Sequence, residues 1–125
     1  MMTGEKDYIS DGNIVVCLTN GRPILAQITG SGCIVGTAVA AFCAAARIAA
    51  IPKDQQERVE DGLLTTGDML IGAVGGLLAI TIASEIAAVR EDVHGSGTVL
   101  PALIDELGKL TPELISSKAK VEIIL

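Results

Sequence analysis

Two long runs without a charged residue limit most strongly what this chain can fold into. They extend from Pro23 to Ala46 and from Met69 to Ser84. Runs this apolar must be buried, either in a membrane or inside a protein core. The first run contains Gln27 and a turn of small residues, the second is shorter than the roughly 20 residues that a span requires, and neither has Trp or Tyr at its ends. We therefore expect buried helices of a soluble α/β protein and no membrane hairpin.

The charge of the chain argues against nucleic acid as a partner. Its 125 residues include 9 Lys and Arg against 15 Asp and Glu, which gives a net charge of −6. Phosphate backbones are normally bound by a concentrated basic face, which this balance does not supply. Any phosphate must therefore be held locally, by backbone amides or a metal. The odd count of 3 cysteines, without metal-ligand spacing, favours a reducing, cytoplasmic compartment.

The first half of the chain predicts a β-hairpin followed by a helix. Residues 13–19 are rich in β-branched side chains and are followed by Asn20-Gly21, a hairpin-turn signal, so residues 22–28 are expected to return as the partner strand. After a break of small residues, the segment from Cys33 to Ala50 is almost wholly Ala, Val, Ile and Cys, and Pro52 follows it. This composition predicts a helix that is buried nearly all round.

The second half is expected to be mainly helical. The segment from Glu57 to Arg90 predicts a long helix whose first charged residues face water. We expect it to be broken or kinked at three glycines: Gly72, Gly75 and Gly76. Residues 99–110 have apolar side chains at helical spacing and are expected to be capped by Thr98, with Thr111-Pro112 ending that helix. The segment from Val121 to Ile124 predicts a last short strand.

A candidate anion site lies between the first strands and the first helix. The chain there reads Thr29-Gly30-Ser31-Gly32, a turn of small residues that opens a long helix. Glycines let the backbone approach a ligand, and a helix start offers N–H groups with a partial positive charge, so an anion can be bound without a basic side chain. Small residues also occupy such corners for steric reasons alone, and both interpretations stay open.

The three cysteines divide between the site and the core. Cys33 is expected at or beside the helix start, where the positive end of the helix stabilises a thiolate. A role as a base is therefore open to it, beside the plainer role of a small buried hydrophobe. Cys17 and Cys43 stand in strongly apolar runs and are expected to be such hydrophobes.

Other polar residues are assigned structural or surface roles. Glu85 lies in an apolar helix, where an unpaired carboxylate is costly, so we expect it to pair with a backbone donor or with Arg90. His94, the single histidine, is expected in a surface turn. Asp7 and Asp11 are placed to approach a metal, but acidic residues in a turn are usually solvated, and both are left out of the site.

Four segments carry, in order, the motifs of a known enzyme family. Thr3 to Gly12 (TGEKDYISDG) is similar to the segment T-G-E-x-D-Y-I-x-D-G, and Gly30-Ser31-Gly32-Cys33 is similar to a G-T-G-C turn at the same spacing. Residues 83–88 resemble A-x-E-x-A-A, and Gly95-Ser96 resembles the start of G-S-F, with Gly97 in place of Phe. Over nearly its whole length the chain thus resembles the hydroxyethylthiazole kinases of the ribokinase-like superfamily.

The resemblance implies roles for individual site residues. Thr3 matches a threonine that contacts ATP, and Gly30 matches a glycine at the thiazole alcohol. Cys33 stands where other ribokinase-like kinases have an aspartate that helps deprotonate the attacking hydroxyl. Cys33, Gly30 and Gly32 are thus the implied catalytic residues, with the amides of the turn stabilising the transferred phosphoryl charge. Because a thiol suits the base role less well than a carboxylate, we expect the turn to matter more than Cys33.

The resemblance also implies a fold and an assembly. It implies an α/β, ribokinase-like fold present in part: the β-hairpin, the small-residue turn, a mainly helical layer and the last short strand. Residues 1–125 would form the carboxy-terminal part of a single kinase domain, because this length is small for a complete ATP-dependent kinase. The amino-terminal half, with most of the thiazole pocket and the magnesium ligands, is then expected elsewhere. Family members are homotrimers, and fungal ones are fused to a thiamine-phosphate synthase, an origin that the resemblance leaves open here.

The implied reaction is phosphoryl transfer from ATP, with Mg²⁺, to the hydroxyl of 5-(2-hydroxyethyl)-4-methylthiazole in thiamine biosynthesis. In it the chain would supply the anion-binding turn and part of the ATP site. The alternative is a catalytically inactive oligomerisation or regulatory module that retains the same fold. Both interpretations require the same core, so the sequence does not distinguish between them.

Overall fold

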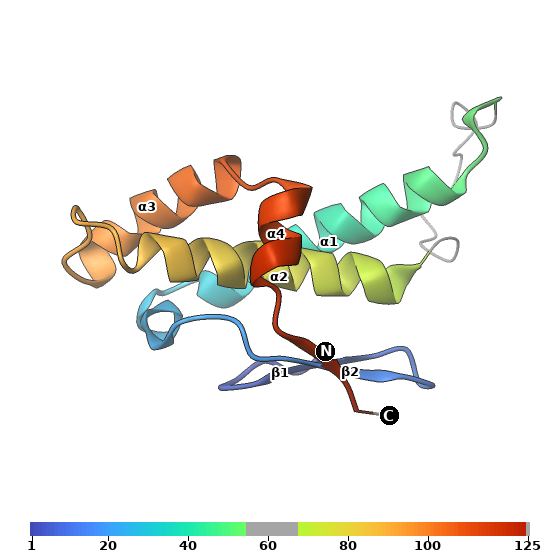
Figure 1. The fold of residues 1–125 in the computed structure, drawn as a ribbon, viewed down its shortest axis with the longest axis horizontal. Helices are drawn as coiled ribbons and strands as arrows, with labels where there is room; N and C mark the ends of the chain where they lie inside the picture. Colours follow the sequence, from blue (N-terminus) through green and yellow to red (C-terminus); the bar gives the residue numbers. More distant parts are fainter. Residues whose placement is uncertain (55–67, 125) are drawn as a thin grey trace.

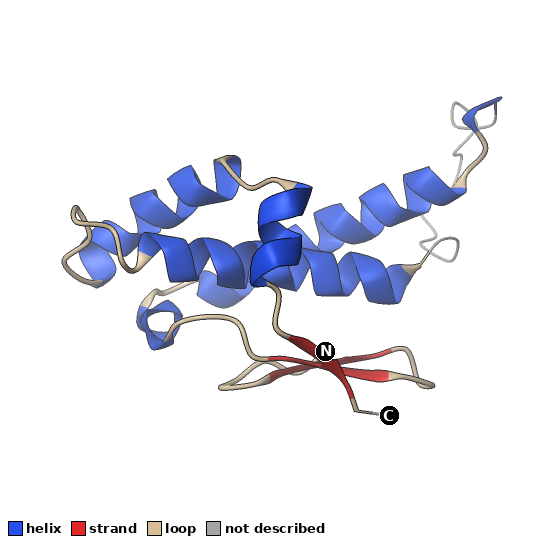
Figure 2. Cartoon of the chain, viewed as in Figure 1, coloured by secondary structure: helices blue, strands red, loops and turns tan. Residues whose placement is uncertain are grey.

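The computed structural model describes residues 1–54 and 68–124. A small antiparallel sheet lies on one side of a layer of helices (Figures 1 and 2). The strands β1 (Asp7–Ser10), β2 (Val15–Leu18) and β3 (Val121–Ile123) stand in the order β1-β2-β3. The helical segments, in chain order, are the 3-10 helix η1 (Pro23–Gln27), α1 (Ser31–Ala50), α2 (Met69–Ala87), α3 (Ser96–Gly108) and α4 (Pro112–Lys118). The expected last strand is therefore confirmed as β3.

The hairpin of β2 is formed with β1, and the prediction that residues 22–28 would be its partner is wrong. Asp7 lies opposite Leu18 in the antiparallel pair, and the connecting turn includes Gly12 at φ 98°. The other edge of β2 is occupied by β3, so no edge is left for a strand at 22–28. That segment forms η1 instead, starting at Pro23, whose fixed φ suits the first position of a helix.

Two hydrophobic clusters hold the helices and the sheet together. The inner face of the sheet packs against α2 through one group of buried side chains: Ile9, Val16, Leu18, Leu77, Leu78 and Ile82. The far end of α2 packs against η1 and α3 through a second group: Ile28, Ala83, Ala87, Val99, Ala102 and Leu103. α2 takes part in both, so it is the central helix of the described structure.

α2 runs from Met69 to Ala87 as one helix, and its glycines do not break it. A Cβ on Gly72 would lie 2.8 Å from the Cα of Cys43 in α1, and a Cβ on Gly76 would lie 2.6 Å from the Cα of Val39. The expected break at these glycines is therefore wrong, because Gly72 and Gly76 bring the two helix backbones together within a continuous helix. The helix start is capped by Asp68, whose Oδ1 accepts the N–H of Ile71. The expected first turns, from Glu57 onward, lie outside the described residues.

α1 is the helix that the first apolar run predicts, but it is not buried nearly all round. Against the described part of the chain none of its residues is buried, and Phe42 and Ile48 are 37% and 53% exposed. One side of α1 packs along α2, while its remaining apolar surface is not covered by described residues (Figure 1). By length and apolar composition α1 and α2 both qualify as candidate membrane spans, although α2 is the core helix here.

Hydrogen bonds to threonine hydroxyls stabilise the starts of α3 and α4. α3 begins at Ser96, earlier than expected, and Thr98 lies inside its first turn, where the hydroxyl accepts the N–H groups of His94 and Gly95. α4 was not expected, because Thr111-Pro112 was interpreted only as the end of the preceding helix. The hydroxyl of Thr111 accepts the N–H of Leu114 and Pro112 takes the first helical position, so the pair starts a helix. His94 is exposed, as expected.

Glu85 pairs with a backbone donor, as expected, but not with Arg90. Its Oε1 accepts the N–H of Gly21 at 2.9 Å. α2 ends at Ala87, so Arg90 leaves the helical face of Glu85 and forms ion pairs with Asp92 and Glu106 instead.

Candidate functional site

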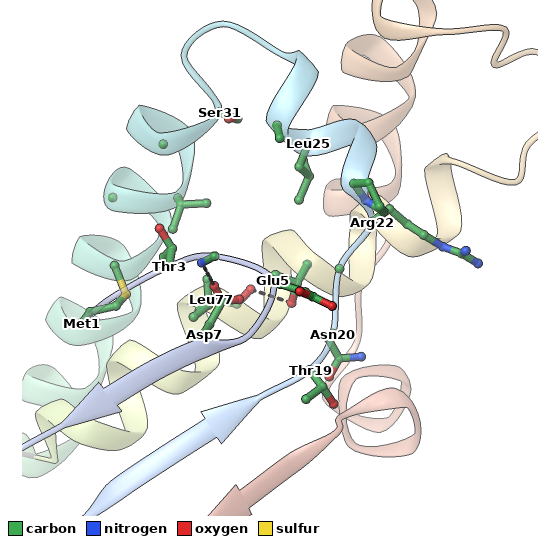
Figure 3. A pocket seen from close by; sticks show the side chains of 18 residues that line it. Met1, Thr3, Glu5, Asp7, Thr19, Asn20, Arg22, Leu25, Ser31 and Leu77 are labelled. Carbon is green, nitrogen blue, oxygen red and sulfur yellow. Dashed lines mark hydrogen bonds between the residues drawn. The ribbon is translucent and has the colours of Figure 1, made fainter.

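A cavity of about 730 Å³ opens between the amino-terminal segment, the connection from β2 to η1, and the first turns of α1 (Figure 3). Its volume lies in the range of small-molecule sites. Its floor is apolar, with Leu25, Val35 and Leu77 from three different elements. Its polar lining includes Thr3, Glu5, Asp7, Thr19, Asn20, Arg22, Ser31 and Thr81.

The amino-terminal segment is folded back so that Thr3 reaches the cavity. Met2 and Tyr8 exchange two backbone hydrogen bonds of 2.8 Å, which close the segment into a loop. The N–H of Gly4 donates to Oδ1 of Asp7 at 3.1 Å and fixes the tip of that loop. Thr3, predicted as the nucleotide contact, therefore lies on the cavity wall.

The turn before α1 contains a glycine in a left-handed backbone conformation. Gly30 is the residue before the first helical position and has φ 87°, a left-handed value that glycine adopts without strain. Among the described residues no side chain caps this end of α1. The first N–H groups of an α-helix have no partner inside the helix and carry partial positive charge. The end of α1 that lines the cavity can therefore bind an anion through its backbone.

The structure brings some predicted site residues together and leaves others beside the cavity. Ser31 and Gly32 line it together with Thr3, whereas Gly30 and Cys33 are not among the lining residues. Cys33 is exposed in the first turn of α1, so it is accessible from solvent and is not a buried hydrophobe. Cys17 is buried, as expected, and Cys43 is half-buried against α2, with its Sγ 3.7 Å from the carbonyl oxygen of Met69.

Asp7 is a cavity residue that the sequence interpretation left out. Its side chain is buried, and this desolvation raises its pKa, while the hydrogen bond from Gly4 opposes that rise. A signal for this was present, because Asp7 and Ile9 alternate on the buried face of β1. Asp11 differs, since it is exposed in the turn and accepts the N–H groups of Asn13 and Ile14. Leaving Asp11 out of the site is consistent with this position.

Charge in the cavity comes mainly from acidic groups and the helix end. Figure 3 shows the side chain of Arg22 extending away from Thr3 and Ser31, although the residue contributes to the wall. Within residues 1–54 and 68–124, no group of His, Cys, Asp or Glu gathers in a way that would hold a metal ion. The first turn of α1 is thus the part of this lining that offers backbone N–H groups to an anion.

Residues 1–113 match the model of the hydroxyethylthiazole kinase family. The chain belongs to this family. A hydroxyethylthiazole kinase from Roseiflexus sp. (strain RS-1) is 36% identical over 120 residues, and one from Caldivirga maquilingensis is 36% identical over 124 residues. The structure of a hydroxyethylthiazole kinase protein from Pyrococcus horikoshii OT3 is similar with a TM-score of 0.73 at 27% identity over 99% of the chain. The expected partial ribokinase-like α/β fold is thereby confirmed.

The chain corresponds to only a part of these hydroxyethylthiazole kinases. It spans 36% of the Roseiflexus relative, 38% of the Caldivirga relative and 40% of the Pyrococcus chain. The match nevertheless takes in the amino-terminal loop, the small-residue turn and the cavity between them, since it runs through residues 1–113.

Proposed function

We propose that the chain forms part of a kinase that transfers a phosphoryl group from ATP to the hydroxyl of 5-(2-hydroxyethyl)-4-methylthiazole in thiamine biosynthesis. The observation that carries the proposal is the cavity, in which Thr3 of the TGEKDY segment shares a wall with Ser31 and Gly32 of the turn. Membership of the hydroxyethylthiazole kinase family supports it.

In the proposed site each group has one task. Thr3 contacts the nucleotide, and the backbone amide of Gly32 in the turn stabilises the charge of the transferred phosphoryl group. Gly30 lies at the thiazole alcohol, where its left-handed backbone keeps the turn open. Cys33, the third residue of α1, accepts the proton of the attacking hydroxyl when it is present as a thiolate. ATP is the phosphoryl donor, with Mg²⁺ as its counterion.

The remaining parts of the proposed site come from outside residues 1–125. The chain spans 36–38% of the length of these two relatives, and the described residues contain no metal-binding cluster. We therefore assign the magnesium ligands and most of the thiazole pocket to another segment or polypeptide, with residues 1–125 as the carboxy-terminal part of the domain. The uncovered apolar surface of α1 supports such a partner, because exposed patches of this kind are normally covered in the working assembly. A cytoplasmic homotrimer is the proposed assembly.

The second candidate function is an inactive oligomerisation or regulatory module with the same fold. The same surface of α1 favours it, since it offers an interface whether or not catalysis occurs. The two candidates differ in one respect, namely whether the turn still supports phosphoryl transfer.

A hybrid enzyme tests the proposal. Residues 1–125 replace the matching segment of the Roseiflexus hydroxyethylthiazole kinase, and ADP release is measured with Mg-ATP in the presence and absence of the thiazole alcohol. We expect turnover that requires the alcohol. Equal rates with and without it would contradict the assigned substrate. A hybrid that is folded by circular dichroism but inactive, beside an active parent enzyme, would favour the inactive module.

A further inference from the structure

The carboxylate of Glu85 reaches from the central helix to the wall of the cavity. Its Oε1 accepts the backbone N–H of Gly21 at 2.9 Å. Its two oxygens also lie 3.3 and 3.4 Å from Nδ2 of Asn20. The Glu85 side chain is only 17% exposed and does not line the cavity, whereas Asn20 and Gly21 do. The carboxylate of Glu85 therefore contacts the cavity wall through Asn20 and Gly21.

Asn20 extends the same contacts to the carboxy-terminal segment. Its Nδ2 donates to the carbonyl oxygen of Lys118 at 3.0 Å, and its Oδ1 accepts the N–H of Lys120 at 2.7 Å. Asn20 is 5% exposed, so these bonds are largely shielded from water. A buried amide with its donors and acceptor engaged in this way has one favourable orientation. The end of β2 is thereby tied to α2 and to the start of β3.

The backbone at Gly21 needs outside contacts to keep a single conformation. Gly21 has φ 125°, a region that a chain with glycine can enter and leave freely. Its only described side-chain anchor is the carboxylate of Glu85, while Thr81 of α2 stands behind it, 3.6 Å from where a Cβ would lie. Without the carboxylate, the part-buried N–H of Gly21 would lose its acceptor and the connection to η1 would be free to move.

We infer that Glu85 is a positioning residue, which fixes Asn20 and Gly21 in the wall of the cavity. The inference rests on the proposed kinase function, since it assigns the cavity to ATP. The negative charge of Glu85 is not the essential property for this role. One amide oxygen of glutamine, placed like Oε1, can accept from both Gly21 and Asn20, so the acceptor is what matters.

Three variants separate this role from general stabilisation. Glu85→Ala removes the acceptor, Glu85→Gln keeps it without charge, and Lys120→Ala removes only the long 3.7 Å ion pair with Glu85. In the 125-residue chain, hydrogen exchange of the Gly21 amide is measured against that of core amides in α2. In the hybrid enzyme, KM for ATP and kcat are measured at a temperature where circular dichroism shows each variant to be folded.

We expect Glu85→Ala to accelerate Gly21 exchange selectively and to raise KM for ATP by about tenfold or more, with kcat changed by less than about threefold. Glu85→Gln should restore both readouts to near the parent values, and Lys120→Ala should leave them unchanged. Unchanged Gly21 exchange, or an unchanged KM in an active hybrid, would overturn the positioning role. An unaltered hybrid without activity, beside an active Roseiflexus parent, would instead count against the proposed function itself.

Discussion

Gly76 of α2 lies backbone to backbone against Val39 of α1: a Cβ at residue 76 would stand 2.6 Å from the Cα of Val39. Gly72 has the same arrangement one turn earlier, where a Cβ at residue 72 would stand 2.8 Å from the Cα of Cys43. Residues four apart share a face of a helix, so both glycines point at α1. Side chains at these positions would push the two helices apart.

The first prediction concerns this crossing. Gly76→Ala should lower the free energy of unfolding by roughly 1–3 kcal/mol, because the added methyl meets backbone atoms that cannot rotate away. Urea denaturation followed by circular dichroism measures the change. Gly97→Ala is the matched control, since the space around Gly97 in α3 is open and alanine favours a helix. If Gly76→Ala proves as mild as the control, the close contact of α1 and α2 is not essential for stability.

The second prediction concerns the backbone of Gly30. Gly30→Val should reduce turnover of the hybrid enzyme by about a hundredfold or more, because valine does not tolerate φ 87° and the amides of the turn would be displaced. A Cβ at this residue meets no atom within 4 Å, so the expected loss comes from conformation and not from a clash. Gly30→Asn should retain more activity, since asparagine enters the left-handed region more readily. Equal loss in both variants would point to contact with the substrate instead.

The third prediction concerns Cys33, which is exposed one residue beyond Gly32. Cys33→Ala should lower the rate of the hybrid by roughly ten- to a thousandfold, the usual scale for loss of a general base. Cys33→Asp should preserve or raise the rate, because a carboxylate is ionised at neutral pH. An inactive Cys33→Asp together with an active Gly30→Val would overturn both assignments and leave the turn as a tight corner.

The fourth prediction follows from the opposite environments of Asp7 and Asp11. Burial raises the pKa of Asp7, so the folded state holds its proton more tightly than the unfolded state and loses stability as pH rises towards the raised pKa. Asp7→Asn removes this loss, so its stability relative to the parent should rise as the pH is raised from about 4, near the ordinary pKa of an aspartate, into the neutral range. Two backbone N–H groups lower the pKa of Asp11, so its ionised form stabilises the folded state. The stability of Asp11→Asn relative to the parent should therefore fall over the same pH range. Urea denaturation across this pH range measures both, and parallel curves for the two variants would contradict the assignment.

The fifth prediction concerns self-association. The apolar surface of α1 is not covered by described residues, and exposed surfaces of this kind drive assembly. We expect a self-associated species, with a trimer as the proposed form, in multi-angle light scattering at micromolar concentration. Ile48→Ser, at a 53% exposed position on α1, should weaken the association, whereas Ile104→Ser on exposed α3 should not. A monomer under these conditions would refute the prediction.

Several elements could be predicted from signals that are local in the sequence. The long apolar runs became α1 and α2, the small-residue turn opens α1 with Gly30 in the left-handed region, and Val121 starts the last strand. Each depends on composition or spacing over a few neighbouring residues, which act before any distant contact forms. The motifs around Thr3 and Cys33 were likewise sufficient to indicate the family.

Which distant segments contact one another could not be predicted in this way and became clear from the folded chain. Asn20 binds the carbonyl oxygen of Lys118, 98 residues away, and β3 takes the edge of β2 that a local hairpin would have used. The burial of Asp7 and the close contact at Gly76 depend in the same way on elements that arrive from elsewhere in the chain. Local propensity cannot encode such pairings, because the stability of a strand or a glycine depends on the surface against which it finally packs.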